Sequence, residues 1–231
     1  MKKNSLIFTV MLVSLTLVIL LIYLPPAALN FQFNLGLLVT ITVCAVILTC
    51  TFIFGFKVKS SKEIALIAML GALSAALRIP FAAIPSLNPC TYLITCVGYV
   101  FGGIAGFMVG ILTPLLSNFI LTHGPWTIYQ MFAWGLVGLS SSILGKFKVG
   151  RFGLSFFGFI WGYIFGLIMN LWFWFFFIYP LTFETLLLVE VRSIWFDSLH
   201  AFGNLAFLWF FGLKTIGILE RFKKRFTVNP P

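Results

Sequence analysis

The sequence predicts an all-α integral membrane protein, and three observations carry that prediction. Of its 231 residues, 61% are hydrophobic and only 9% are charged, and the mean hydropathy is +1.11. The apolar residues form runs of about 20 residues, the length of one membrane-spanning helix. Proline, glycine or basic residues separate these runs. The length allows about six to eight spans and leaves no room for a soluble nucleotide-binding domain.

The first 60 residues predict a transmembrane hairpin, which is the first of three expected regions. One helix is expected over about 5–24 and ends at Pro25 and Pro26; the second is expected over about 35–56 and ends before Lys57. The first apolar run is too long for the hydrophobic part of a secretory signal, so we interpret it as a retained span. A membrane domain of six helices over 61–220 and a basic tail over 221–231 complete the division.

The first helix of the six-helix domain is expected over about 62–78. Three prolines then punctuate 79–89, so this segment is predicted to be a semi-rigid loop that closes over a site like a lid. Glycines recur every fourth residue within the next apolar stretch, 90–122: Gly98, Gly102, Gly106 and Gly110. They indicate either a close-packing surface or, as we prefer, a turn at Gly102 between two helices, because one helix of that length would exceed the bilayer core.

The last three helices are expected over about 125–145, 152–179 and 194–217. The first of them follows Gly124 and Pro125, because a proline is tolerated in the first turn of a helix but not in its interior. The second carries an aromatic run that ends at Pro180. The polar segment 180–193, with Glu184, Glu190 and Arg192, is expected to be a loop before the last helix.

The basic residues predict the orientation of the chain. With a cytoplasmic N-terminus and eight spans, only Arg78 and Arg192 of the 15 Lys and Arg residues fall on the outer side. This bias is a strong positive-inside signal and places both termini in the cytoplasm. The net charge of +10 then reflects topology and contacts with lipid headgroups of the bilayer, rather than nucleic-acid binding. The loops at 79–89, 122–125 and 180–193 would face outward.

Polar and aromatic residues gather in the stretch 117–134, at the outer end of two helices. Asn118, His123 and Gln130 flank the turn, and Trp126 and Trp134 each lie four residues from Gln130. Residues spaced by four share a helix face, which predicts an amide between two indoles, suited to a flat organic ligand. The alternative is an interfacial belt, where Trp collects because it is amphipathic.

A second polar group lies on the last helix. Asp197, His200 and Asn204 are spaced by three and four residues, which places them on one stripe. Because ionisable groups within spans usually face a cavity with a partner, they predict a site in which Arg78 is the counter-charge of Asp197. The alternative is that this pair and Asn204 only join two helices. Asn170 is expected to form an interhelical hydrogen bond.

Other classes of function find little support in the sequence. No HExxH, GxGD or GxSxG motif and no phosphate-binding loop is present, so we predict neither an enzyme nor a cofactor or metal site. Nothing repeats as the selectivity filter of a channel would. The four cysteines, Cys44, Cys50, Cys90 and Cys96, lack metal-type spacing and are expected to be small buried side chains.

The helix over 62–78 has a strip of small residues. Ala68, Ala72 and Ala76 are spaced by four, which lets a second helix approach closely. Such strips also occur in ordinary helix packing. Because this helix begins at the predicted cytoplasmic side, the strip is a candidate docking face for a partner protein.

Five segments of the chain resemble the substrate-binding S components of energy-coupling factor (ECF) vitamin transporters. The resemblance covers about 62–219 and rests on the alanine strip, ALRIPFAAIP, GYVFGGIAGFMVG, SNFILTHGPWTIYQMFAWGLVG and FDSLHAFGNLAF. It is closest to the cobalamin-type S components. Thr122 and His123 depart from the Gly and Gln expected in that signature, and the first two helices are an addition to the usual six.

The resemblance implies a six-helix bundle in a prokaryotic cell membrane, with a ligand site near the outer face. It also implies partners, namely a transmembrane coupling subunit that meets the alanine strip and two cytoplasmic ATPases that drive uptake. We expect a vitamin-like molecule to stack on the two tryptophans and to bond Asn118, Gln130, His200 and Asn204. A stand-alone proton- or ion-coupled carrier, with Asp197 and Arg78 as its titrating pair, remains the alternative.

Overall fold

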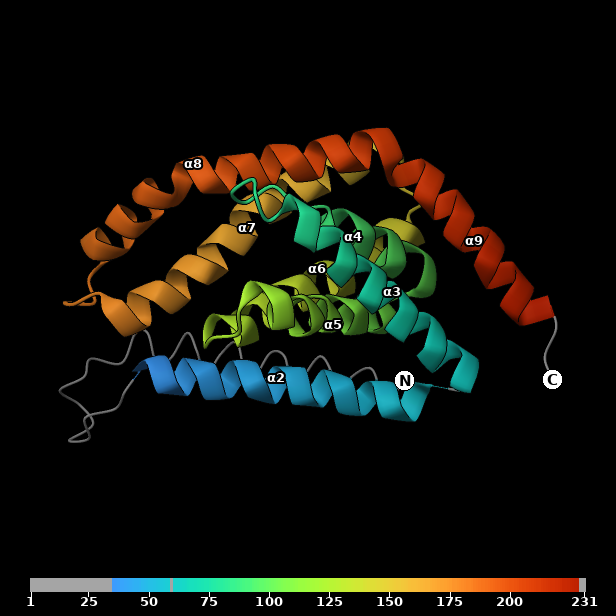
Figure 1. Ribbon diagram of the computed structural model, residues 1–231, viewed down its shortest axis with the longest axis horizontal. Helices are drawn as coiled ribbons and strands as arrows, with labels where there is room; N and C mark the ends of the chain where they lie inside the picture. The colour runs from blue at the N-terminus through green and yellow to red at the C-terminus, as the bar shows by residue number, and fades with distance from the viewer. Residues whose placement is uncertain (1–34, 59, 229–231) are drawn as a thin grey trace.

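The computed structural model describes residues 35–58 and 60–228, and this part of the chain is helical without strands. Figure 1 shows the arrangement of the helices. In chain order they are α2 Leu35–Lys57, α3 Ser61–Phe81, α4 Cys90–Phe101, α5 Gly103–Leu121, α6 Trp126–Lys146, α7 Arg151–Phe177, α8 Phe183–Phe207, a short π-helical segment η2 Leu208–Gly212, and α9 Leu213–Val228.

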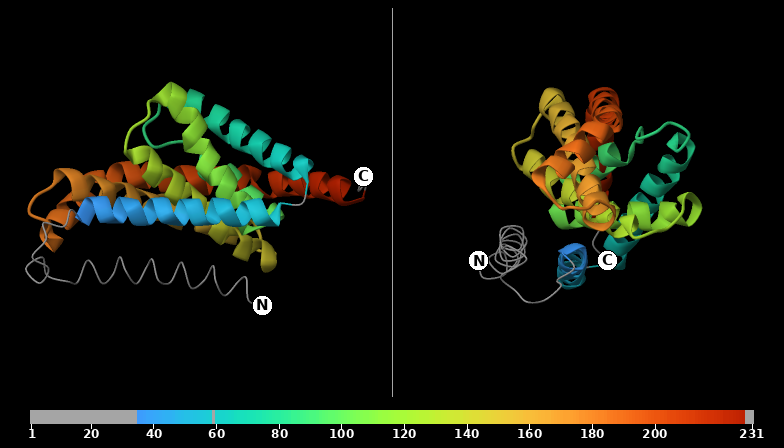
Figure 2. Two further views of the ribbon diagram at one scale, coloured as in Figure 1. Left: turned by 90° about the horizontal axis from the view of Figure 1, so that it is seen from below. Right: turned by 90° about the vertical axis from the view of Figure 1, so that its left-hand side faces the viewer.

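The helix lengths confirm the all-α membrane class. Six helices in the described residues are long and apolar enough to cross a membrane, and α4 is a shorter apolar helix. The first helix of the predicted hairpin lies outside the described residues, so the count of eight spans stays a prediction. Its second helix is α2, which packs along α5, α6 and α7 on one side of the bundle, as Figures 1 and 2 show.

Two turns form where the sequence predicts them. Gly102 separates α4 from α5 with φ of +94°, a left-handed conformation that glycine adopts without strain. The second turn follows α5, where Thr122 has φ of +83°, and Pro125 is the N-cap of α6. Thr122 is β-branched and therefore strained in this conformation, which explains why glycine would suit this position better.

The recurrent glycines of α4 and α5 also allow close packing, so both interpretations of the glycine pattern hold. A Cβ built on Gly98 would lie 2.2 Å from the carbonyl oxygen of Gly138, and one on Gly106 would lie 2.6 Å from the same atom. Gly110 similarly contacts the backbone of Trp134. Backbone-to-backbone contact between α4, α5 and α6 therefore forms the centre of the bundle.

Two predicted boundaries are wrong. Helix α3 continues through Pro80 to Phe81, because a proline in the last turn removes only one hydrogen bond. The segment 180–193 is mostly helix: α8 begins at Phe183, and Thr182 and Thr185 form a capping box at its start. The polar residues that suggested a loop instead lie on this helix, and the helix continues through η2 into α9.

Helices α7 and α8 form a long hairpin that reaches beyond α3–α6 at the left of Figure 1. Helix α7 has 27 residues, or about 40 Å at 1.5 Å per residue, which exceeds a ~30 Å bilayer core. Asn170 joins the two helices, because its Nδ2 donates to Glu190 Oε2 at 3.1 Å and to Ser193 Oγ at 2.5 Å. The predicted interhelical role of Asn170 is confirmed.

Candidate ligand-binding cavity

A cavity of about 510 Å³ lies at the end of the bundle where α3 meets the 82–89 loop. Its walls come from α3, this loop, α5, α6, α7 and α8. The lining residues are Arg78, Phe81, Ala82, Ile84–Asn88, Leu121, Gln130, Trp134, Phe165, Gly166, Met169, Asp197 and His200. Segments far apart in the sequence therefore enclose one space, which we call the central cavity.

Arg78 reaches the central cavity from the last turns of α3. Its Nη1 donates to Ser117 Oγ at 2.8 Å and to Asn118 Oδ1 at 2.7 Å on α5. The guanidinium carbon lies 4.9 Å from the ring centroid of Trp134, within the range of a cation–π contact. Hydrogen bonds and an aromatic face thus fix the position of a cation at the cavity wall.

Asn118 lies behind the cavity wall and connects Arg78 to α6. It is 2% exposed, and its Nδ2 donates to Gln130 Oε1 and to Thr127 Oγ1, both at 2.9 Å. Because the Gln130 oxygen accepts this bond, the amide NH₂ of Gln130 is the group left to donate to a ligand. Asn118 therefore orients two lining side chains.

Three neighbouring rings form the aromatic wall of the cavity. The centroids of Trp134 and Phe165 are 4.7 Å apart, and those of Phe165 and His200 are 5.0 Å apart with nearly parallel planes. The rings come from α6, α7 and α8. This wall is suited to the flat face of an organic ligand.

A chain of hydrogen bonds behind this wall connects three helices to the loop. Trp134 Nε1 donates to Thr91 Oγ1 at 3.1 Å, and Thr91 Oγ1 lies 3.3 Å from His200 Nε2. His200 Nδ1 lies 2.8 Å from the carbonyl oxygen of Ser86. One assignment satisfies every group: Thr91 donates to Nε2, and His200 is neutral with its proton on Nδ1, donated to Ser86. His200 thereby holds the loop at a residue with φ of +58°.

Asp197 lines the central cavity from α8, whereas Arg78 lines it from α3. Its Oδ2 accepts a hydrogen bond of 2.6 Å from Ser193 Oγ, and its carboxylate packs against Gly166 of α7, where a Cβ would lie 2.2 Å from Oδ1. The predicted Asp197–Arg78 ion pair is wrong, because Arg78 is held on α5 by Ser117 and Asn118. The two charged groups instead line the same cavity.

Three further predicted site residues do not line the cavity. His123 is exposed, next to Phe119, and the Trp126 ring contacts Trp172 at 5.9 Å. Asn204 is fully buried, and its Nδ2 donates to the Gly158 carbonyl oxygen at 3.2 Å, between α8 and α7. Trp126 differs from Trp134 in position because eight residues on a helix rotate by about 800°, that is, two full turns plus ~80°.

Sequence reasoning missed Ser117, Thr91, Phe165 and Met169. Ser117 adjoins Asn118 and could have been recognised, because two consecutive polar residues at a helix end are unusual in a span. Thr91 and the residues of α7 have no such signal. Thr91 becomes important only because α4 places it between Trp134 and His200, which is a tertiary property.

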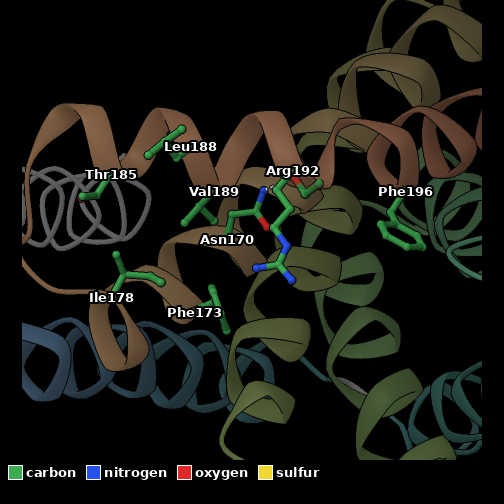
Figure 3. Close-up of a pocket in the computed structure, with 9 residues that line it drawn as sticks. Asn170, Phe173, Ile178, Thr185, Leu188, Val189, Arg192 and Phe196 are labelled. Atoms are coloured by element: carbon green, nitrogen blue, oxygen red, sulfur yellow. Dashed lines mark hydrogen bonds between the residues drawn. The ribbon is translucent and has the colours of Figure 1, made fainter.

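Two shallower grooves flank the α7–α8 hairpin. One, of about 570 Å³, is lined by Glu190 and Asp197 among apolar side chains. The other, of about 390 Å³, is shown in Figure 3, where Asn170 and Arg192 point into it from α7 and α8 among apolar side chains. Asp197 lines both the first groove and the central cavity, so its carboxylate lies between them.

The small-residue strip of α3 is exposed along its length. Ala68, Ala72 and Ala76 are all exposed, while Gly71 and Ala75 on the adjoining stripe of the helix are buried. Helix α3 packs on α5 and α4 through that buried side. The strip therefore presents a flat surface outside the bundle.

The cysteines are spread through the bundle and are not paired with one another. All four are free; Cys50, Cys90 and Cys96 are buried, and Cys44 is partly exposed. The expectation of small buried side chains is confirmed for these three. In the part of the chain that the structure describes, no group of three His, Cys, Asp or Glu residues is placed to hold a metal ion.

Comparison with known proteins gives one match. Residues 62–222 match the family model described as "ECF transporter, substrate-specific component". No curated protein and no solved structure matches the chain. The match begins at the start of α3 and extends into α9, so it includes every residue that lines the central cavity.

Proposed function

Because the chain belongs to the family of substrate-specific components of ECF transporters, and is thus a substrate-binding transporter subunit rather than an enzyme, we propose that it captures a vitamin-like molecule in the central cavity. Uptake would then be driven by ATP hydrolysis in partner subunits. The observation that carries this proposal is the cavity itself, in which Arg78, Gln130, Trp134, Asp197 and His200 converge from three helices. Its lining combines aromatic and apolar side chains with these convergent polar groups, and polar groups that fix the orientation of a ligand are a feature of small-molecule sites.

The cavity volume bears on the size of the cargo. At about 510 Å³ it lies within the range of about 300–1,000 Å³ that holds drug-sized ligands. This volume supports a compact vitamin-like molecule. The cobalamin-type assignment remains a prediction from the sequence, and a corrinoid would require the 82–89 loop to move outward.

The orientation and the partners are part of the same proposal. The positive-inside bias supports a cavity that opens to the outside, with the start of α3 at the cytoplasm. The exposed strip of Ala68, Ala72 and Ala76 supports docking of an ECF coupling subunit, which would bind two cytoplasmic ATPases. Tight binding alone cannot move the cargo, because a ligand shifts an equilibrium only through its differential affinity for two states. The division of the chain at residues 60 and 220 is likewise a proposal.

The alternative of a proton- or ion-coupled carrier has less support. It required Asp197 and Arg78 to form a titrating pair, and Arg78 instead donates to Ser117 and Asn118. Without that pair, no particular contact in the described residues favours coupling to an ion gradient. A carrier of this kind would accumulate its cargo under a proton gradient without any ATPase.

Mass spectrometry of small molecules extracted from the gently purified protein tests the proposal. The wild type is expected to release a vitamin-like compound at near one molecule per chain. Gln130→Ala is expected to release at least about tenfold less, since the loss of a ligand hydrogen bond and of the Asn118 contact exceeds ~1.4 kcal/mol.

His123→Ala is the matched control, because His123 lies on the same helix–turn–helix unit but outside the cavity. It is expected to retain the compound at the wild-type level. Equal loss in both variants would show that the compound is held elsewhere, and would contradict capture in the central cavity.

A further inference from the structure

The two ends of the central cavity carry opposite charges, separated by aromatic rings. The Arg78 guanidinium lies over Trp134, and the Trp134 ring contacts Phe165. The next residue along α7 is Gly166, against which the Asp197 carboxylate packs. The order across the cavity is therefore cation, two rings and anion, and all of these residues line it.

The cationic end has donors left for a ligand. A guanidinium carries five N–H groups in a planar fork, and Nη1 of Arg78 donates to Ser117 and Asn118. The Nη2 and Nε groups are not used by these contacts. Because the side chain lines the cavity, these groups can donate to a carboxylate or another strong acceptor.

The anionic end has acceptors left for a ligand. A carboxylate offers about four lone-pair positions, and Ser193 donates to Oδ2 of Asp197. A neutral hydroxyl does not compensate the carboxylate charge. Gly166 makes room for this group, because any larger residue would place a Cβ 2.2 Å from Oδ1. The remaining oxygen positions are suited to an ammonium or another polarised N–H.

We propose that the central cavity selects an amphoteric ligand, with an aromatic body, an acidic group directed at Arg78 and a cationic or N–H donor group directed at Asp197. This inference rests on the proposed function. A ligand with both groups compensates both charges, whereas a ligand with only one leaves the other protein charge without a partner in the partly enclosed cavity. The cavity should therefore bind ligands with both groups much more tightly than ligands with only one, because burial of an uncompensated charge is costly.

A matched set of probes tests the inference. Para-aminomethylbenzoate carries both groups across one ring, para-toluate carries only the acid, and para-methylbenzylamine carries only the amine; the corresponding biphenyl compounds extend the separation. Binding is measured by affinity-selection mass spectrometry on the full chain in lipid nanodiscs, with empty nanodiscs as the background. In at least one of the two series, the amphoteric member is expected to be retained about tenfold or more above both singly charged members.

Asp197→Asn gives the decisive comparison, because it removes the charge and keeps the shape. It is expected to abolish the advantage of the amphoteric probe over the acid-only probe. Glu184→Gln is the matched control, since Glu184 is an exposed acid in the first turn of the same helix, and it is expected to keep the wild-type ranking. Thermal unfolding of each variant confirms that it is folded.

Any one of three results would overturn the inference. They are equal retention of singly charged and amphoteric probes, no retention of the amphoteric probes, and an unchanged ranking in Asp197→Asn. Failure of the inference is distinguishable from failure of the proposed function. A neutral compound that copurifies with the wild type and is lost in Gln130→Ala would sustain capture in the cavity and refute amphoteric selection.

Discussion

Gly138→Val is expected to prevent the chain from folding into a monodisperse bundle. A Cβ at Gly138 would lie 2.1 Å from both the carbonyl carbon and the oxygen of Gly106. These are backbone atoms, so no rotamer change can relieve the overlap, and α5 and α6 would have to separate. Overpacking of a core costs about 1–3 kcal/mol where side chains can adjust. We expect Gly138→Val to lower the stability by more than this, because the contact between Gly138 and Gly106 also positions Trp134 and Gln130 on α6.

The measurement is size-exclusion chromatography in mild detergent together with the thermal unfolding midpoint. Gly55→Val is the control, because Gly55 is also a helical glycine, on α2, and a Cβ there would meet nothing within 4 Å. It is expected to behave as the wild type. A monodisperse Gly138→Val protein with a wild-type midpoint would contradict the close approach of α5 and α6.

Ala72→Trp is expected to abolish ATP-driven uptake and to leave ligand capture intact. Ala72 is exposed at the centre of the alanine strip, on the side of α3 that faces away from the bundle. Small residues let two helices approach closely within a membrane, and an indole at this position would hold a docked helix away. We expect the affinity for the coupling subunit to fall about tenfold or more, which corresponds to ~1.4 kcal/mol or more of binding free energy. Arg78, which lines the cavity, lies two residues beyond Ala76, the last residue of the strip.

Two readouts on the same preparation separate docking from binding. Copurification of the coupling subunit and ATPases reports docking, and the extracted small molecules report capture. Ala45→Trp is the control, because Ala45 is also an exposed alanine of a predicted span, on α2; it is expected to preserve both. Loss of the small molecule from Ala72→Trp would show that α3 acts on the cavity and would refute a separate docking role.

The sequence was most informative where short-range sterics decide the structure. Gly124 and Pro125 cannot continue a helix, and Gly102 adopts a left-handed conformation, so the ends of α4, α5 and α6 were predictable. The start of α8 was predictable in principle from Thr182 and Thr185, which form its capping box. That signal was obscured by the nearby charged residues, which are also typical of a loop.

The candidate cavity was predictable only in part, because its residues come from separate helices. Polar and indole groups are costly or specifically placed within spans. Five lining residues could therefore be recognised from the sequence as site candidates: Arg78, Gln130, Trp134, Asp197 and His200. Their mutual contacts depend on how the helices pack. Spacing alone could not show that Arg78 would bond to α5 rather than to Asp197, or that the ring of Trp126 would turn toward Trp172.

Uptake into proteoliposomes tests the central claim most directly. The chain is reconstituted alone, and also with the ECF coupling subunit and ATPases from its own organism, and the compound that copurifies with it is supplied outside. The account predicts accumulation only with the partners and internal ATP, and none by the chain alone under a proton gradient. Accumulation by the chain alone under that gradient, without ATPases, would contradict the account and establish a stand-alone carrier.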